Sequence, residues 1–263
     1  MYNAARHADP IYNISNFPAR YANPIYDINN YGVPDENPFE DSVLPYWRNG
    51  GTRTFIVGTP GSGKSNLICD LLYTKLKYDN LFYYAPEASL HQEKLEQLKD
   101  AYLLIKPKYS DRTKSVEFLF TSNIDDIKLD LMNPDERNVI VLDDALSLNS
   151  KSQIARLNML LTTTRHNNAI VFVLSQEYFD IPKTSRNNCN MFMLFKVNSK
   201  FQLQSIYRDS PLEISYREFV RLKNIVARTQ FNFLTIDKRE GAPDELKIRD
   251  GLRPFPPGTI QIE

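Results

Sequence analysis

Residues 58–65, GTPGSGKS, constrain the fold of this chain more than any other stretch. They follow an apolar segment, TRTFIVG (52–58), and precede KSNLICDLLYTKL (64–76), whose apolar residues fall on one face of a helix. The stretch fits G-x-x-x-x-G-K-[ST], in which glycines let the backbone turn inward so that its N–H groups surround phosphate oxygens. The pattern therefore predicts a strand, a phosphate-binding turn and a helix, in that order.

The residue types in this turn indicate a nucleoside triphosphate and a metal ion. Lys64 supplies a mobile cation for the phosphates, and the Ser65 hydroxyl is a ligand suited to Mg²⁺. The chain has no N-K-x-D motif for guanine, so we expect ATP and Mg²⁺ as cofactors. The residues expected to contact the nucleotide are Gly58, Thr59, Pro60, Gly61, Ser62, Gly63, Lys64, Ser65 and Asn66.

Two carboxylates at the end of a second apolar segment complete this predicted site. In VIVLDDA (139–145), Asp143 and Asp144 follow four apolar residues. Asp143 is expected to hold Mg²⁺, directly or through water. Asp144 lies on the opposite side of the strand, where it would polarise a water for attack on the γ-phosphate. Glutamate is the usual base in this place, so the alternative is that Asp144 only hydrogen-bonds around the site.

A third apolar segment, AIVFVLS (169–175), is flanked by polar residues that fit a nucleotide switch. In ATPases with a strand inserted between the two nucleotide-binding strands, that strand ends in a polar sensor, which predicts that Gln176 contacts the γ-phosphate or the attacking water. Arg165 precedes the strand and is expected at the opposite edge, as an arginine finger for a neighbouring subunit's nucleotide. Arg186 is a second finger or sensor candidate. The alternative for Gln176 is that it only caps the loop at the end of the strand. The alternative for Arg165 and Arg186 is that they only cap local structure in their own subunit.

The order of apolar segments predicts an α/β fold with a mostly parallel central sheet flanked by helices. The strands are uniformly apolar, as strands covered on both faces are. Predicted strands are 52–58, 80–85, 115–121, 138–144, 169–175, 191–196 and 231–237. Predicted helices are 64–76, 89–105, 152–165 and 212–227.

Composition divides the chain into three parts, of which residues 51–237 are the predicted ATPase domain. Residues 1–50 hold six prolines, six tyrosines, eight asparagines and no lysine, which predicts an irregular arm. Within it DPIYNISN (9–16) is echoed by NPIYDINN (23–30), so the arm either wraps on the domain or docks on a partner through a duplicated motif. Residues 238–263 hold four prolines and three glycines and are expected to form an irregular tail.

Bulk composition favours a soluble protein of a reducing compartment. Cys69 and Cys189 lie far apart and form no C-x-x-C, so neither a disulfide framework nor a zinc site is expected. No run approaches the roughly 18 apolar residues of a membrane span, and the start of the chain lacks the apolar region of a signal peptide. The net charge of zero does not indicate a nucleic-acid binder, although binding follows local patches.

Four motifs that occur in order within residues 52–200 carry a resemblance to a known family: GTPGSGKS, VIVLDDA, TRHNNAIVFVLSQEYFDIPKTSRNN and MFMLFK. Together they resemble the genome-packaging ATPases of the FtsK–HerA superfamily, in particular the poxvirus type found in large DNA viruses and virophages. The resemblance implies a RecA-like P-loop NTPase domain of the class with an additional strand (ASCE). It also implies a homo-oligomeric ring, usually a hexamer, that pumps double-stranded DNA into a preformed capsid.

The same resemblance implies roles for individual residues and a location. Lys64 and Ser65 would bind nucleotide and Mg²⁺, Asp143 and Asp144 would form the acidic pair, and Gln176 would be the sensor. The expected location is the host cytoplasm at the viral assembly site, or the virion. The arm at residues 1–50 has no counterpart in the resemblance, and it would suit a capsid or membrane protein at the packaging vertex.

Local charge fits a DNA partner that is held without reading its sequence. Residues 181–208 contain no acid, and the basic residues between 145 and 208 are Lys151, Arg156, Arg165, Lys183, Arg186, Lys196, Lys200 and Arg208. Such a basic half would contact DNA phosphates inside a ring. The alternative is ordinary solvated charge and contacts between subunits.

Two other functions share parts of this pattern. A nucleoside or nucleotide kinase has the same phosphate turn, but it also needs an acceptor pocket and an arginine-bearing lid in place of a paired Asp-Asp and a sensor strand. A scaffolding protein that binds ATP for virion assembly without hydrolysing it would not need an intact Asp143–Asp144 pair. ATP turnover stimulated by double-stranded DNA separates the packaging motor from both.

Overall fold

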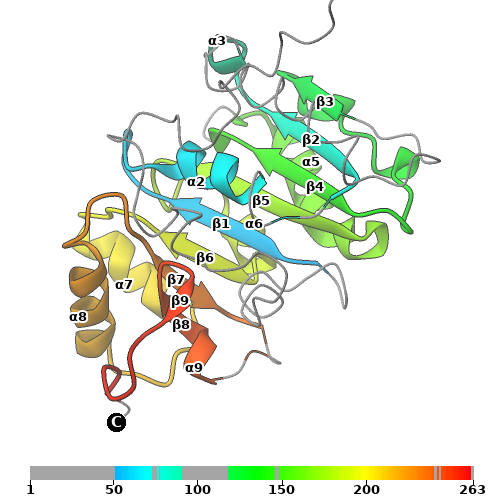
Figure 1. Ribbon diagram of the computed structural model, residues 1–263. Helices are drawn as coiled ribbons and strands as arrows, with labels where there is room; N and C mark the ends of the chain where they lie inside the picture. The colour runs from blue at the N-terminus through cyan, green and yellow to red at the C-terminus, as the bar shows by residue number, and fades with distance from the viewer. Residues whose placement is uncertain are drawn as a thin grey trace, which may run out of the picture.

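A nine-stranded sheet forms the centre of the computed structural model, which describes residues 51–72, 76, 78–90, 118–145, 148–239, 242 and 244–261 (Figure 1). The strand order is β3-β2-β4-β5-β1-β6-β7-β8-β9. The strands are β1 Arg53–Val57, β2 Asn80–Tyr84, β3 Phe118–Thr121, β4 Asn138–Leu142, β5 Ala169–Ser175, β6 Met191–Leu194, β7 Leu234–Asp237, β8 Ile248–Asp250 and β9 Arg253–Pro254. The α-helices are α2 Lys64–Asp70, α3 Glu87–Leu90, α5 Lys151–Thr163, α6 Lys183–Asn188, α7 Lys200–Arg208, α8 Tyr216–Val226 and α9 Asp244–Lys247.

The strands from β3 to β6 run parallel, as the sequence predicts, and β5 lies between β1 and β4. The register pairs Val57 of β1 with Ser175 of β5, and Leu142 of β4 with Val173 of β5. The carboxyl ends of all three strands therefore reach the same edge of the sheet, where the loops that follow them can meet.

Helices cover both faces of this sheet, which explains why its strands are apolar on every side. On one face, α2 packs Leu67, Ile68 and Cys69 against alternate strand residues such as Phe172. On the other face, α5 and the helices α7 and α8 pack against the residues in between. Every residue of β5 is buried, in agreement with a strand that is covered twice.

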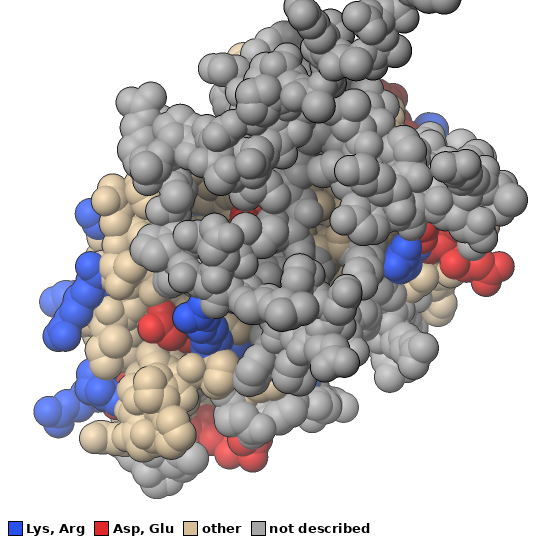
Figure 2. All heavy atoms as spheres, in the orientation of Figure 1, with Lys and Arg blue, Asp and Glu red and all other residues tan. Residues whose placement is uncertain are grey.

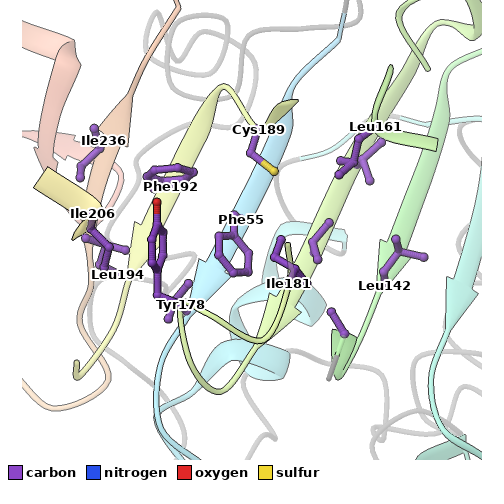
Figure 3. Packing of buried hydrophobic residues seen from close by; sticks show 14 of the residues in the cluster. Phe55, Leu142, Leu161, Tyr178, Ile181, Cys189, Phe192, Leu194, Ile206 and Ile236 are labelled. Atoms are coloured by element: carbon purple, nitrogen blue, oxygen red, sulfur yellow. The ribbon is translucent and has the colours of Figure 1, made fainter. Parts of the chain in front are cut away.

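An aromatic cluster packs on β1 and β6, on the sheet face that α5, α7 and α8 cover. The Phe55 ring lies 5.9 Å from the Tyr178 ring and 6.1 Å from the Phe192 ring, measured between centroids (Figure 3). Tyr178 belongs to the loop that follows β5, so this packing fixes that loop to the sheet.

Local sequence signals set several element ends. Ser150 begins α5 with a capping box in which its side chain accepts from the Gln153 N–H, and the Gln153 side chain accepts from the Ser150 N–H. Ser215 caps α8 by accepting from the Glu218 N–H, so this helix begins later than the prediction of 212. The sequence pattern predicts neither α6 nor α7, because α6 has no apolar residue and α7 is only nine residues long.

Residues 238–263 differ from the irregular tail that their prolines and glycines predict. They contribute α9, β8 and β9, and β8 pairs antiparallel with β7. Leu252 and Phe255 are buried. The prediction failed because strands of two and three residues are too short to show an alternating pattern. The predicted arm at 1–50 and most of the predicted helix at 89–105 lie outside the described residues.

No helix in the described part of the chain is both long and apolar enough to cross a membrane.

A buried ion pair joins β7 to β8. Arg249 has no exposed surface, and its guanidinium lies 3.5 Å from the Asp237 carboxylate, which also accepts from Arg239 Nε at 2.8 Å. Burial lowers the pKa of Arg249 to about 10, although Asp237 opposes the shift. The pair ties the C-terminal strands to the sheet.

Replacing Arg249 with Ala is expected to lower the free energy of unfolding by about 1–3 kcal/mol, because the buried Asp237 carboxylate loses its partner on β8 and keeps Arg239. Urea unfolding followed by circular dichroism measures the change. Arg217→Ala, at an exposed position on α8, serves as the control and should stay within about 0.5 kcal/mol of the parent. Equal effects of the two substitutions would contradict the assigned role of Arg249.

Candidate nucleotide-binding site

The loop between β1 and α2 adopts the inward turn that its glycines predict. Gly61 and Gly63 have φ angles of 72° and 105°, in the left-handed region that glycine adopts without strain. A Cβ added to Gly58 would lie 2.5 Å from the Phe195 Cβ, so a larger residue does not fit there. The loop therefore depends on glycine both for its path and for its close contact with the chain after β6.

Backbone hydrogen bonds hold the start of this loop to both neighbouring strands. The Gly58 N–H donates to the Ser175 carbonyl at 3.2 Å, and the Thr59 N–H donates to the Lys196 carbonyl at 3.4 Å. The Ser62 hydroxyl is buried inside the loop and has no hydrogen-bond partner among the described residues. A buried polar atom of this kind needs a partner, and a phosphate oxygen would provide one.

Lys64, the first residue of α2, folds back over the loop. Its ammonium donates to the Gly58 carbonyl at 2.6 Å and to the Thr59 carbonyl at 3.3 Å. Burial lowers the pKa of Lys64, while the carboxylates of Asp143, Asp144 and Asp180 oppose this shift. A triphosphate in the loop would add negative charge beside the ammonium and stabilise its charged form.

Asp143 lies directly after β4 and faces this lysine across the site. Its Oδ2 accepts hydrogen bonds from the Ser65 hydroxyl at 3.2 Å and from the Tyr83 hydroxyl at 2.9 Å. Burial raises the pKa of Asp143, and these two hydrogen bonds and the charge of Lys64 act in the opposite direction. Oxygen donors that converge in this way suit Mg²⁺, so Ser65 and Asp143 fit the metal role predicted for them.

Asp144 follows Asp143 and has an unusual backbone conformation. Its φ angle of 56° lies in the left-handed region, which costs a residue other than glycine of order 1–3 kcal/mol. Aspartate tolerates this conformation better than most residues. Strained backbone of this kind is concentrated at functional sites.

Gln176 follows the last residue of β5 and is half-buried. Because the Ser175 carbonyl accepts from the Gly58 N–H, Gln176 lies beside the start of the phosphate loop. The Asp180 carboxylate accepts hydrogen bonds from the Ser175 hydroxyl and from the Glu177 N–H, at 2.8 Å in the second case. The residues on both sides of Gln176 are thus held by one carboxylate.

The two arginines predicted as fingers occupy different surroundings. Arg165 lies in a 3-10 turn, Thr164–Asn167, at the amino end of β5 and so at the edge opposite to the loop. Arg186 is only 7% exposed, its guanidinium lies 4.4 Å from the centre of the Tyr178 ring, and its Nη1 donates to the Ile181 carbonyl at 2.6 Å. These contacts pack the Arg186 guanidinium against the loop that follows β5 in its own subunit, and its role as a finger or sensor stays a prediction.

Tyr83 is a member of the site that sequence reasoning missed. It pairs with Val141 across β2 and β4, and its ring stacks on Phe120 with centroids 5.1 Å apart. Asp143 is two residues beyond Val141 and therefore on the same face of the sheet. Burial and the Asp143 charge raise the pKa of Tyr83 well above its usual range, so the hydroxyl stays a donor. Only the strand register could have revealed this contact.

A strand between the two nucleotide-binding strands, a glycine-rich phosphate loop and an acidic pair at one sheet edge define a P-loop NTPase of the class with an additional strand. The chain belongs to the poxvirus A32 protein family, whose model matches residues 48–236. The resemblance to poxvirus-type genome-packaging ATPases is thereby confirmed.

Solved structures share this fold at low sequence identity. B204, the DNA-packaging ATPase from Sulfolobus turreted icosahedral virus, is 15% identical, with a TM-score of 0.50 over 79% of this chain and 100% of its own. The genome-packaging NTPase B204 from Sulfolobus turreted icosahedral virus 2, in complex with sulfate, is 18% identical, with a TM-score of 0.50 over 79% of this chain and 98% of its own. No curated protein sequence matches the chain.

Replacing Tyr83 with Phe removes the hydroxyl that orients Asp143 while keeping the stacked ring. Loss of such a supporting hydrogen bond typically weakens metal binding roughly 10–100-fold. We expect a weakening of this size for Mn²⁺, used as a Mg²⁺ substitute, measured by electron paramagnetic resonance with a non-hydrolysable ATP analogue.

Tyr207→Phe provides a matched control. Tyr207 lies on α7, and its hydroxyl donates a hydrogen bond of similar length, 2.8 Å, to the Ile214 carbonyl. The substitution should leave Mn²⁺ binding unchanged. Unaltered Mn²⁺ binding in Tyr83→Phe would show that the hydroxyl does not support the metal site.

Proposed function

We propose that the chain is an ATPase that uses ATP hydrolysis to move double-stranded DNA into a viral capsid. The observation that carries this proposal is the convergence of Lys64, Ser65 and Asp143 at the edge where β1, β4 and β5 end. Membership of the poxvirus A32 family supports it. The structural neighbour B204 is described as a DNA-packaging ATPase, which supports DNA packaging as the use of the hydrolysis.

In this proposal the loop at 58–65 binds the β- and γ-phosphates. Its N–H groups surround the phosphate oxygens. The Lys64 ammonium gives up its hydrogen bonds to the Gly58 and Thr59 carbonyls and donates to the triphosphate instead. Ser65 and Asp143 would hold Mg²⁺. The ion, when bound, neutralises charge that develops on the transferred phosphoryl group.

Asp144 and Gln176 carry the hydrolytic step in the proposal. The Asp144 carboxylate accepts a proton from the attacking water, a role that contributes roughly 10²–10⁴-fold to a rate. The Gln176 amide, beside the start of the loop, orients that water and responds to loss of the γ-phosphate. Arg165 remains the candidate for acting on a neighbouring subunit's nucleotide in a ring, with a hexamer as the expected size.

The loop after Gln176 is connected to α7, which offers a route from nucleotide to movement. The Tyr178 N–H donates to Gln202 Oε1 at 3.1 Å, and its hydroxyl donates to the Asp209 carboxylate at 2.6 Å. A shift of this loop on hydrolysis would therefore pull on both ends of α7. We propose α7 and its neighbours as the moving element.

Basic residues around α7 support contact with DNA phosphates. Four of them are exposed: Lys183, Lys196, Lys200 and Arg208. Basic side chains also gather along the edge of the molecule where α7 and α8 lie (Figure 2). Phosphate contacts of this type hold DNA of any sequence.

In the same proposal the arm at 1–50 binds a capsid or membrane protein at the packaging vertex, in the host cytoplasm or the virion.

Double-stranded DNA is expected to stimulate ATP hydrolysis by the purified chain, and Asp144→Asn should lower the stimulated rate roughly 10²–10⁴-fold while ATP binding persists. A phosphate-release assay with and without linear duplex measures the rate. Asp135→Asn, an exposed position before the amino end of β4, serves as the control and should hydrolyse ATP normally.

Two results would replace this proposal. Phosphate transfer to an added nucleoside or nucleotide, with no response to DNA, would indicate a kinase. Virion assembly and DNA filling that proceed normally with Asp144→Asn would indicate a scaffolding protein that binds ATP without a hydrolytic cycle.

A further inference from the structure

Phe231 stands out in the segment between α8 and β7. Its φ angle is 63°, a left-handed conformation that is rare for a bulky side chain and persists only where the surroundings impose it. The four residues before it, 227–230, are exposed, and Phe231 itself is half-buried. The turn therefore keeps part of an aromatic ring at the surface at an energetic cost.

The sheet register places this ring beside the phosphate loop. Val57 of β1 pairs with Leu194 of β6, and Leu194 pairs with Leu234 at the start of β7. The residues just before β7 therefore lie at the same sheet edge as the end of β1. The loop from α8 to β7 lies next to the turn from β1 to α2 (Figure 1). Phe231 Cβ and Cδ1 lie 3.4 Å from the position that a Cβ on Gly63 would take.

Two other phenylalanines nearby have a different role. Phe195 is 2% exposed and Phe233 is fully buried, and their rings pack together with centroids 5.0 Å apart. They form the floor beneath the loop, because Phe195 also lies under Gly58 and Gly63. Phe231 is the member of this group with surface left to contact a ligand.

We propose that Phe231 stacks on the base of the nucleotide whose phosphates the loop at 58–65 binds, an inference that rests on the proposed nucleotide binding. An aromatic face beside a phosphate site suits a flat base, and such stacking is worth roughly 1–3 kcal/mol per base. Stacking does not read the edge of the base. The subsite therefore takes nucleoside triphosphates with any base, and the phosphates supply the rest of the affinity.

The test compares ATP with tripolyphosphate, which has the phosphates but no base, by isothermal titration with Mg²⁺. Phe231→Gly removes the ring and accepts the left-handed backbone without strain, so the fold is retained. It should weaken ATP binding by about 5- to 150-fold, the range that corresponds to the stacking energy, and leave tripolyphosphate binding unchanged. Phe231→Trp, which keeps an aromatic face, should bind ATP as the parent does.

Phe201→Ala serves as a matched control, because Phe201 is an exposed aromatic residue on α7, and it should change neither affinity. Equal weakening of ATP and tripolyphosphate by Phe231→Gly would show that the ring only supports the loop. Unchanged ATP binding would exclude a contact with the base. If the parent chain bound neither ligand, the proposed nucleotide site would fail, and this inference with it.

Discussion

The parallel pairing of β5 with both β1 and β4 is the constraint on which the site depends. It brings the ends of three strands to one edge, so that the phosphate loop, the acidic pair and Gln176 meet although they are far apart in sequence. The hydrogen bond from the Gly58 N–H to the Ser175 carbonyl extends this pairing into the loop itself. A change in the loop therefore reaches the segment after β5 through the backbone, without an intervening side chain.

The charges at this edge are arranged for a ligand with the opposite pattern. Burial lowers the pKa of Lys64 and raises the pKa of Asp143, so the surroundings disfavour both charges. Each group is meanwhile held by hydrogen bonds, Lys64 to loop carbonyls and Asp143 to Ser65 and Tyr83. A triphosphate with Mg²⁺ places an anion beside the lysine and a cation beside the carboxylate, which favours both charged forms. Binding would thus remove an electrostatic cost already present in the fold.

Features with a local signal were predictable from the sequence, and those created by packing were not. The glycines of the loop, the apolar run of β5 and the position of Asp143 after β4 follow from neighbouring residues alone. Tyr83 and Phe231 join the site only through strand register, which single segments do not reveal. The packing of the Arg186 guanidinium over the Tyr178 ring is likewise a tertiary contact that the neighbouring sequence does not indicate. The C-terminal strands β8 and β9 could not be predicted, because three and two residues are too few to show an alternating pattern.

The central claim is that a nucleoside triphosphate binds in the loop between β1 and α2, with its metal between Ser65 and Asp143. The most direct measurement is a structure of the protein with Mg²⁺ and a non-hydrolysable ATP analogue. The account predicts phosphate density along the N–H groups of residues 61–65, and a cation within about 2.1 Å of the Ser65 and Asp143 oxygens or one water away from the carboxylate. An empty loop at saturating analogue, or an analogue bound elsewhere on the chain, would contradict it.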